Sequence, residues 1–130
     1  MGQNILVIDD DAQLREYAAE LLKIDGHTVN QLGDALDIVQ HVRNEKVDLV
    51  LIDYHLPGVD GLMALRQLRS KHMTLPVIVM TADISPQVIL QFFRAGADDF
   101  ISKPFDEAYL SLIVNRTIDR VSISLKDAVY

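Results

Sequence analysis

The chain has 130 residues, 49% of them hydrophobic, which is enough to bury the core of one compact domain and is not typical of a disordered chain. The absence of cysteine excludes disulfides, thiolate catalysis and zinc–thiolate sites, and no apolar run approaches the roughly 18 residues of a membrane-spanning helix. A net charge of −7 argues against direct nucleic-acid binding, and we expect a cytoplasmic protein without a membrane partner.

The first half of the chain alternates short apolar runs with longer amphipathic segments. In chain order these predict a strand at 4–9, a helix at 12–24, a strand at 28–32, a helix at 35–44 and a strand at 47–53. Asp11 is placed to cap the first helix and Asp34 the second. Residues 49–52 are all apolar, which favours a parallel strand covered on both faces.

The second half continues the same alternation. In chain order it predicts a loop at 56–61, a helix at 62–71, a strand at 77–81, a helix at 86–95, a strand at 99–102 and a helix from 107 to about 120. Ser85 and Pro86 form an N-cap followed by proline at the first helical position, and Asp106 caps the last helix. We expect one domain over 1–120, with 121–130 either extending the last helix or beginning a linker.

Five strand–helix units without a long linker predict an α/β domain, a parallel sheet covered by helices on both faces. Ligands of such sheets bind outside the carboxyl ends of the strands, so the residues that end each strand matter most. The second predicted strand ends in an apolar residue. The first, third, fourth and fifth end in polar groups, namely Asp9-Asp10, Asp53, Thr81 and Ser102-Lys103.

These polar groups suggest phosphoryl-transfer chemistry. Three carboxylates at one edge repel each other, and a hard divalent cation such as Mg²⁺ relieves the repulsion. With the cation present, Asp53 can attack a phosphoryl donor as a nucleophile. The Lys103 ammonium can stabilise charge on the phosphoryl oxygens, and the Thr81 hydroxyl can donate a hydrogen bond.

The ordered motifs resemble the receiver domain of two-component response regulators, over about residues 3 to 120. The matching segments are Ile8-Asp9-Asp10, Asp53 to Gly58 with Asp60-Gly61, Thr81-Ala82, Gly96 to Phe100 and Lys103-Pro104-Phe105. The resemblance implies a flavodoxin-like three-layer sandwich, with a five-stranded, doubly wound parallel sheet in the order 2-1-3-4-5.

The resemblance also implies a role for each residue at the sheet edge. Asp53 is expected to be the phosphoacceptor, with Thr81 and Lys103 assisting its reaction. The Mg²⁺ ligands are expected to be the carboxylates of Asp9, Asp10 and Asp53 and the backbone carbonyl of His55, with Asp10 a direct ligand and Asp9 bound partly through water.

Three further expectations concern the switch. The resemblance implies that Phe100 is the switch aromatic that responds when Thr81 moves toward the phosphoryl group, and that the Lys103–Pro104 peptide is cis. His55 and Asp83 each lie two residues beyond a site residue, where they are expected to tune dephosphorylation by flanking the path of the attacking water.

The function implied is a signalling switch that accepts a phosphoryl group from a histidine kinase or phosphotransfer protein. The fourth helix, fifth strand and fifth helix would offer a surface for a partner or a homodimer. A small Mg²⁺-dependent aspartyl-phosphate hydrolase is an alternative, although His55 stands where such an enzyme needs an acidic residue. A flavodoxin-like cofactor binder would need a phosphate-binding loop where the chain has Asp9-Asp10-Asp11.

Overall fold

A computed structural model describes the backbone of residues 2–129 and the side chains of residues 2–122. The five strands are β1 Asn4–Ile8, β2 Thr28–Leu32, β3 Leu49–Asp53, β4 Val77–Thr81 and β5 Asp99–Ser102. The five helices are α1 Ala12–Ile24, α2 Ile38–Asn44, α3 Gly61–Ser70, α4 Pro86–Arg94 and α5 Glu107–Val129. None of the helices in this described part is long and apolar enough to cross a membrane.

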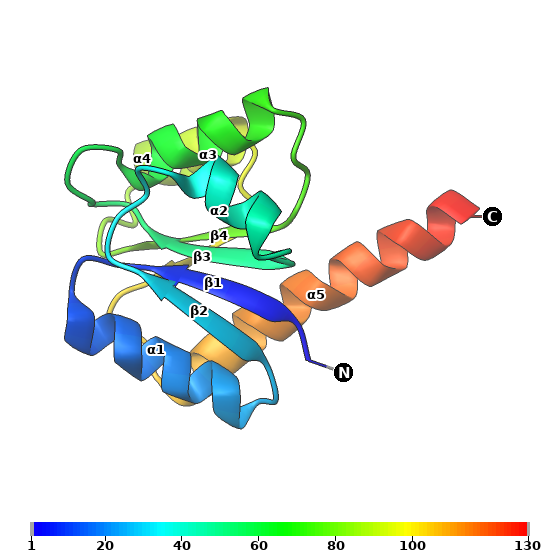
Figure 1. The fold of residues 1–130 in the computed structure, drawn as a ribbon, viewed down its shortest axis with the longest axis horizontal. Helices are drawn as coiled ribbons and strands as arrows, with labels where there is room; N and C mark the ends of the chain where they lie inside the picture. The colour runs from blue at the N-terminus through cyan, green and yellow to red at the C-terminus, as the bar shows by residue number, and fades with distance from the viewer. Residues whose placement is uncertain (1, 130) are drawn as a thin grey trace.

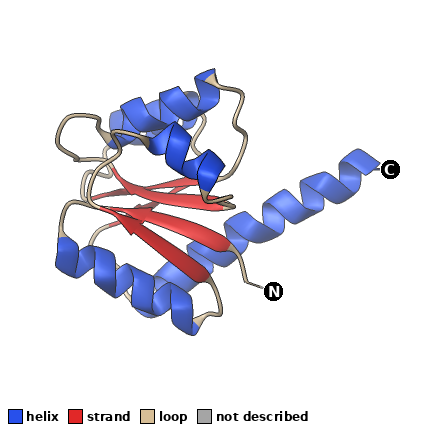
Figure 2. Cartoon of the chain, in the orientation of Figure 1, coloured by secondary structure: helices blue, strands red, loops and turns tan. Residues whose placement is uncertain are grey.

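The strands form one parallel sheet in the order β2-β1-β3-β4-β5, which confirms the predicted topology. Figure 1 shows α1 and α5 on one face of the sheet and α2, α3 and α4 on the other. The three layers are equally clear when the chain is coloured by secondary structure (Figure 2). The α5 helix continues beyond the edge of the sheet, toward the C-terminus.

Successive side chains of the central strand point to opposite faces of the sheet, and both faces are covered by helices, which explains why the strand is apolar at every position from 49 to 52. Leu49 and Leu51 of β3 pack into the core beneath α1 and α5, whereas Val50 and Ile52 pack into the core beneath α2, α3 and α4. All four side chains are almost completely buried. Because both faces are covered, a polar residue on this strand is tolerated only at its end, where Asp53 stands.

Side-chain caps mark the starts of α1, α3 and α5. The Asp11 carboxylate accepts the backbone N–H groups of Gln13 and Leu14, which confirms its predicted role at the start of α1. Asp106 accepts the N–H of Tyr109 at 2.9 Å in the first turn of α5, as its predicted capping role requires. Both caps satisfy backbone donors that have no partner inside the helix.

The predicted start of the second helix was wrong. Asp34 does not cap a helix from residue 35, because its carboxylate accepts the N–H of Leu36 at 3.1 Å in a local turn. The α2 helix begins three residues later, at Ile38, and Asp37 precedes it without a side-chain capping bond. A short Asp side chain that bonds the backbone two residues on competes with helix formation, and here the turn wins.

Candidate functional site

Three carboxylates meet at the carboxyl ends of β1 and β3. One oxygen each from Asp9, Asp10 and Asp53 lies within 4.8 Å of the others. The Asp9 and Asp53 side chains are only 1% and 7% exposed, whereas Asp10 is exposed to solvent. The parallel register of β1 and β3 brings these residues together across more than forty positions of the chain. The structure therefore places the three predicted acids in one cluster that could hold a metal ion.

Lys103 joins this cluster from the end of β5. Its Nζ lies 3.0 Å from Asp9 Oδ2 and 3.0 Å from Asp53 Oδ1, so one ammonium bridges two buried carboxylates. The backbone N–H of Lys103 donates to the carbonyl of Thr81 at 2.8 Å, which fixes the loop to the end of β4. The Lys103–Pro104 peptide is cis.

Burial and charge shift the ionisation of both partners. Burial raises the pKa of Asp53; contact with Lys103 opposes the shift, and the negative charges of Asp9 and Asp10 add to it. Burial alone would lower the pKa of Lys103, but its hydrogen bonds to Asp9 and Asp53 outweigh burial and raise it. The lysine is therefore held as a cation, and its single charge does not offset three carboxylates.

The Thr81 hydroxyl is turned toward the loop after β4. Its Oγ1 accepts the N–H of Asp83 at 3.0 Å and lies 3.2 Å from the Asp83 carbonyl oxygen, to which it can donate. The side chain is fully buried at the end of β4. Thr81 therefore lies at the predicted edge, with its hydroxyl held by its own loop in this structure.

His55 lies on the loop after β3, and Asp83 lies on the loop after β4. The carboxylate of Asp83 accepts the N–H of Ser85 at 2.9 Å, and this bond, reinforced by the charge of nearby His55, lowers the pKa of Asp83. Both side chains are exposed. The Asp83 carboxylate thus has a structural task in the loop before α4, which the sequence pattern did not suggest.

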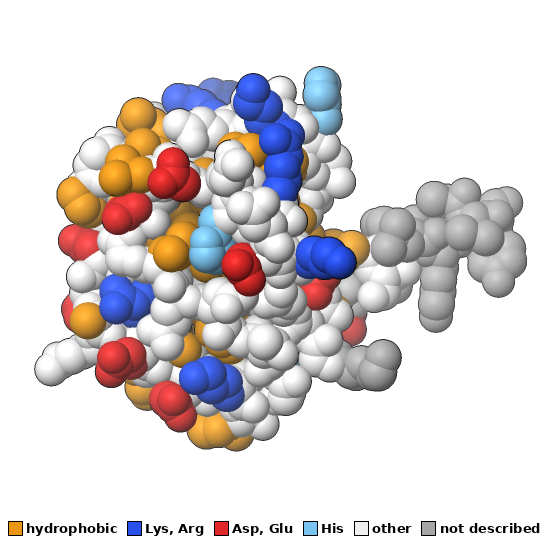
Figure 3. All heavy atoms as spheres, viewed as in Figure 1, with side chains coloured by type: hydrophobic (Ala, Val, Ile, Leu, Met, Phe, Trp, Pro, Cys, Tyr) orange, Lys and Arg blue, Asp and Glu red, His pale blue; other side chains and the backbone are white. Residues whose placement is uncertain are grey.

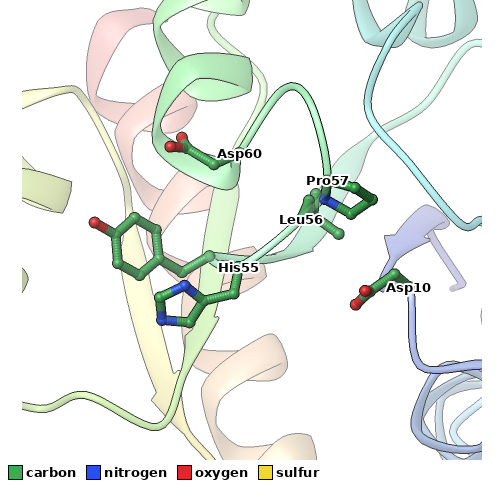
Figure 4. A pocket seen from close by; sticks show the side chains of 6 residues that line it. Asp10, His55, Leu56, Pro57 and Asp60 are labelled. Carbon is green, nitrogen blue, oxygen red and sulfur yellow. The ribbon is translucent and has the colours of Figure 1, made fainter.

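An open cavity of about 410 Å³ lies beside the carboxylates, lined by Asp10, Tyr54, His55, Leu56, Pro57 and Asp60. Figure 4 shows Asp10 on one side of this cavity and His55 on the other. The ring of Tyr54 lies 4.6 Å from that of His55 and meets buried Phe92 of α4 edge-on at 5.2 Å. The cavity leaves the acidic edge of the sheet open to solvent beside Asp10.

Phe100 lies outside the carboxylate cluster. It stands on β5 opposite Val79 of β4, half-buried against the core beneath α4. Its ring meets that of Phe93 edge-on, with the centroids 6.4 Å apart. This places an aromatic side chain between the sheet and α4, separate from the residues that would contact a phosphoryl group.

The sequence did not predict a role at the site for two residues, Arg15 and Gly61. Arg15 of α1 donates from Nη1 to the backbone carbonyl of Asp9 at 2.8 Å, although its spacing resembles that of any solvated helical arginine. Gly61 was noted only within a motif. A Cβ on Gly61 would lie 2.5 Å from the carbonyl oxygen of Asp53, so the close approach of α3 to the end of β3 requires glycine.

Comparison with known proteins agrees with this geometry. The family model described as the response regulator receiver domain matches residues 5–115. The chain is 37% identical over 105 residues to the response regulator MprA of Mycobacterium ulcerans, covering 81% of this chain and 45% of that protein. It is 36% identical over 118 residues to the two-component response regulator PhoP of Pseudomonas aeruginosa, covering 91% and 52%. The chain thus spans about half the length of these two relatives.

Solved structures give the same result. The receiver domain of NtrX from Brucella abortus superposes with a TM-score of 0.81 at 32% identity, covering 88% of this chain and 98% of that one. The receiver domain of the Francisella response regulator 1452 superposes with a TM-score of 0.86 at 26% identity, covering 92% and 99%. With the family model extending over all five strands and receiver domains matching almost end to end, this chain belongs to the response regulator receiver domain family.

Proposed function

We propose that this receiver domain works as a switch whose phosphoacceptor is Asp53. The observation that carries the proposal is the contact between the Asp53 carboxylate and the Lys103 ammonium at 3.0 Å, with two further acids beside them. Asp53 is the acid at the end of the buried central strand, and it faces the open edge of the sheet. In the reaction, a carboxylate oxygen of Asp53 forms a bond to phosphorus while the bond from phosphorus to the donor breaks, and the donor leaves with the electron pair.

The lysine contributes electrostatic stabilisation. As the phosphoryl group passes from donor to Asp53, negative charge is spread over its oxygens. The Lys103 ammonium already lies against Asp53 and remains protonated because its pKa is raised. It therefore offers a preformed positive charge where the transition state needs one.

A magnesium ion fits the chemistry of the acidic cluster. Asp9, Asp10 and Asp53 supply hard oxygen donors, and one lysine leaves excess negative charge among them. In this proposal these three residues and the backbone carbonyl of His55 hold Mg²⁺. The ion, when bound, would offset the charge of the acids and of the incoming phosphoryl oxygens.

The proposal extends to partners. A histidine kinase or a phosphotransfer protein, acting in the cytoplasm, is the proposed donor, and the domain's own catalysis is limited to its phosphorylation and dephosphorylation. Family membership supports this assignment, as does the open cavity beside the acids. The sensor kinase/phosphatase CqsS of Vibrio cholerae contains a segment 36% identical to 83% of this chain, which makes up 16% of that protein.

The α4–β5–α5 face is the proposed surface for a partner or a second copy. Several of its charges are engaged within the chain. Arg116 and Arg120 pair with Asp99 at 2.7 and 3.0 Å, and Asp98 pairs with Arg69 at 3.2 Å. Among the described side chains of these two helices, the large apolar ones that are exposed are Leu90, Phe93 and Leu112. They support a contact that is more apolar than the sequence alone suggested.

The phosphoacceptor assignment is tested by chemical phosphorylation. Wild-type protein incubated with acetyl phosphate and Mg²⁺ should gain the mass of one phosphoryl group, and Asp53→Asn should not. Asp37→Asn, which removes an exposed acid without a capping bond, is the matched control and should be labelled like the wild type. Labelling of Asp53→Asn at the wild-type level would refute the assignment, and steady turnover of simple phosphate esters would instead favour the hydrolase.

A further inference from the structure

The guanidinium of Arg15 holds the turn through which the chain leaves β1. Nη1 donates to the backbone carbonyl oxygen of Asp9 at 2.8 Å, and Nε donates to Oε1 of Gln31 at 3.3 Å. The side chain is half-buried, and its Nη1 would lie 3.5 Å from a Cβ placed on Gly33. Arg15 thus ties the first turn of α1 to the residue that follows β1 and to β2.

Four hydrogen bonds hold Asp9 in place, and one of them comes from Arg15. Its N–H donates to the carbonyl of Leu32 at 3.2 Å, and its Oδ1 accepts the N–H of Asp11 at 3.0 Å. Its Oδ2 accepts from Lys103, and its backbone carbonyl accepts from Arg15. The last of these bonds sets the orientation of the peptide plane between residues 9 and 10, because a carbonyl and the following N–H share one rigid plane.

The neighbouring carboxylate depends on that peptide plane. Asp10 is exposed, yet one of its oxygens lies within 4.8 Å of oxygens of Asp9 and Asp53. Its backbone direction is set by the peptide that Arg15 holds. Loss of the guanidinium would leave the Asp9 carbonyl without this partner and would free the plane to rotate.

We propose that Arg15 is a positioning residue for the metal site, which holds the Asp10 carboxylate in register with Asp53. The inference rests on the proposed function, because it takes Mg²⁺ to be the ion bound there. Gln31 orients the guanidinium from β2, so the strand that ends without an acid contributes to the site through a second layer of contacts. Contacts of this kind commonly govern metal affinity by fixing the ligands.

A purely electrostatic role for Arg15 would have the opposite effect on Mg²⁺ binding, so an experiment can distinguish the two roles. Arg15 is a cation close to a site for a divalent cation, so its charge alone repels Mg²⁺. If Arg15 acted only through charge, its removal would strengthen Mg²⁺ binding. If it acts by positioning, removal weakens binding, and a lysine that keeps the charge fails to restore it because it lacks the planar fork of donors.

The experiment compares Mg²⁺ titrations of wild type, Arg15→Met, Arg15→Lys and Gln31→Ala, followed by backbone amide chemical shifts. We expect the Kd to rise about tenfold in Arg15→Met, as is common for outer contacts of a metal site. Arg15→Lys should also bind more weakly, and Gln31→Ala should shift in the same direction by less. Arg43→Met, at an exposed arginine of α2, is the control and should match the wild type.

A second readout needs no metal. Amide hydrogen exchange at Asp10 and Asp11 in the metal-free protein should be faster in Arg15→Met than in the wild type, with exchange in the central strands unchanged. Unchanged or tighter Mg²⁺ binding by both Arg15 variants, with wild-type exchange in the turn, would overturn the inference while leaving the proposed function intact. A wild-type protein that binds no Mg²⁺ would overturn both. If Arg15→Met does not fold, Arg15→Lys and the exposed Gln31→Ala decide the outcome.

Discussion

Lys103 Nζ lies 3.0 Å from Asp53 Oδ1, so the proposed phosphoacceptor is in contact with a cation before any phosphoryl group arrives. The same nitrogen also contacts Asp9 at 3.0 Å, and the two contacts raise the pKa of the lysine despite its burial. A phosphoryl group on Asp53 would therefore share an ammonium that now bridges two carboxylates. We therefore expect the stability of the metal-free domain and its reactivity to depend on the same side chain.

Replacing the lysine should destabilise the metal-free protein. Lys103→Met would leave the buried Asp9 and Asp53 carboxylates without their cation, and breaking a buried ion pair costs on the order of 3 kcal/mol. Urea unfolding in the presence of a chelator measures the loss. Lys23→Met, which removes an exposed partner of Glu20, should change stability by less than about 1 kcal/mol. Equal effects of the two substitutions would contradict the importance of the bridge.

Neutralising the phosphoacceptor should have the opposite effect at neutral pH. The folded-state pKa of Asp53 is raised above its usual value of 3.8, so the folded protein binds this proton more tightly than the unfolded chain. Its contribution to stability is therefore largest at low pH and is lost as pH rises through the raised pKa. Asp53→Asn has no such loss, and it should melt about 4 °C higher than the wild type at pH 7 if the gain is on the order of 1 kcal/mol.

The pH dependence distinguishes this cause from a packing effect. In metal-free buffer, the advantage of Asp53→Asn should shrink as pH falls toward 4, because the wild-type carboxyl is then protonated as well. Melting curves between pH 4.5 and 7.5 provide the measurement. An advantage that stays constant over this range would mean that desolvation of the charge is not its source.

The two flanking residues should set the lifetime of the phosphorylated state. His55 and Asp83 are exposed on the loops that follow β3 and β4, so their replacement should leave the core intact. We expect His55→Ala and Asp83→Ala to change the dephosphorylation rate by more than twofold, with melting temperatures near that of the wild type. The decay of the phosphorylated mass after removal of the donor gives the rate. Dephosphorylation rates within twofold of the wild type for both variants would show that these two residues do not control the lifetime of the phosphorylated state.

The proposed readout requires Thr81 to exchange partners. Its hydroxyl is now engaged by the backbone of Asp83, so a turn toward a phosphoryl group on Asp53 would release the loop before α4. Phe100, half-buried beneath α4, is the side chain expected to respond. Beryllofluoride, a phosphoryl mimic, should shift the amides of Asp83, Phe100 and α4. Shifts confined to the surroundings of Asp53 would show that the signal leaves by another face.

Much of the fold could be predicted from the sequence because each element carries a local signal. The apolar run 49–52 indicates a strand buried on both faces, and Ser85-Pro86 marks the start of α4. The order of the strands in the sheet has no such local signal in the sequence. Periodicity gave only the alternation of strands and helices, and the order 2-1-3-4-5 came from the resemblance. The start of α2 was mispredicted because a two-residue contact of Asp34 outweighed helix propensity.

The site divides in the same way. The polar residues at the strand ends predicted which side chains form the site, since parallel strands bring their carboxyl ends to one edge of the sheet. The partners of each group could not be predicted, because they depend on side-chain directions set by the whole fold. The bond from Arg15 to a backbone carbonyl and the contact of Thr81 with its own loop are examples. Figure 3 shows acidic and basic side chains interspersed on one face of the molecule.

The bridge between Lys103 and Asp9 joins residues 94 positions apart. The lysine follows the last strand of the sheet and the acid follows the first, so the two meet only after every strand between them has paired. The first three strands in the chain supply all three acids, but they do not supply the lysine that contacts two of them. The proposed phosphoacceptor and the cation that contacts it therefore come together only when the strand at the far edge of the sheet is in place, so the complete site is a property of the whole sheet and not of any one segment.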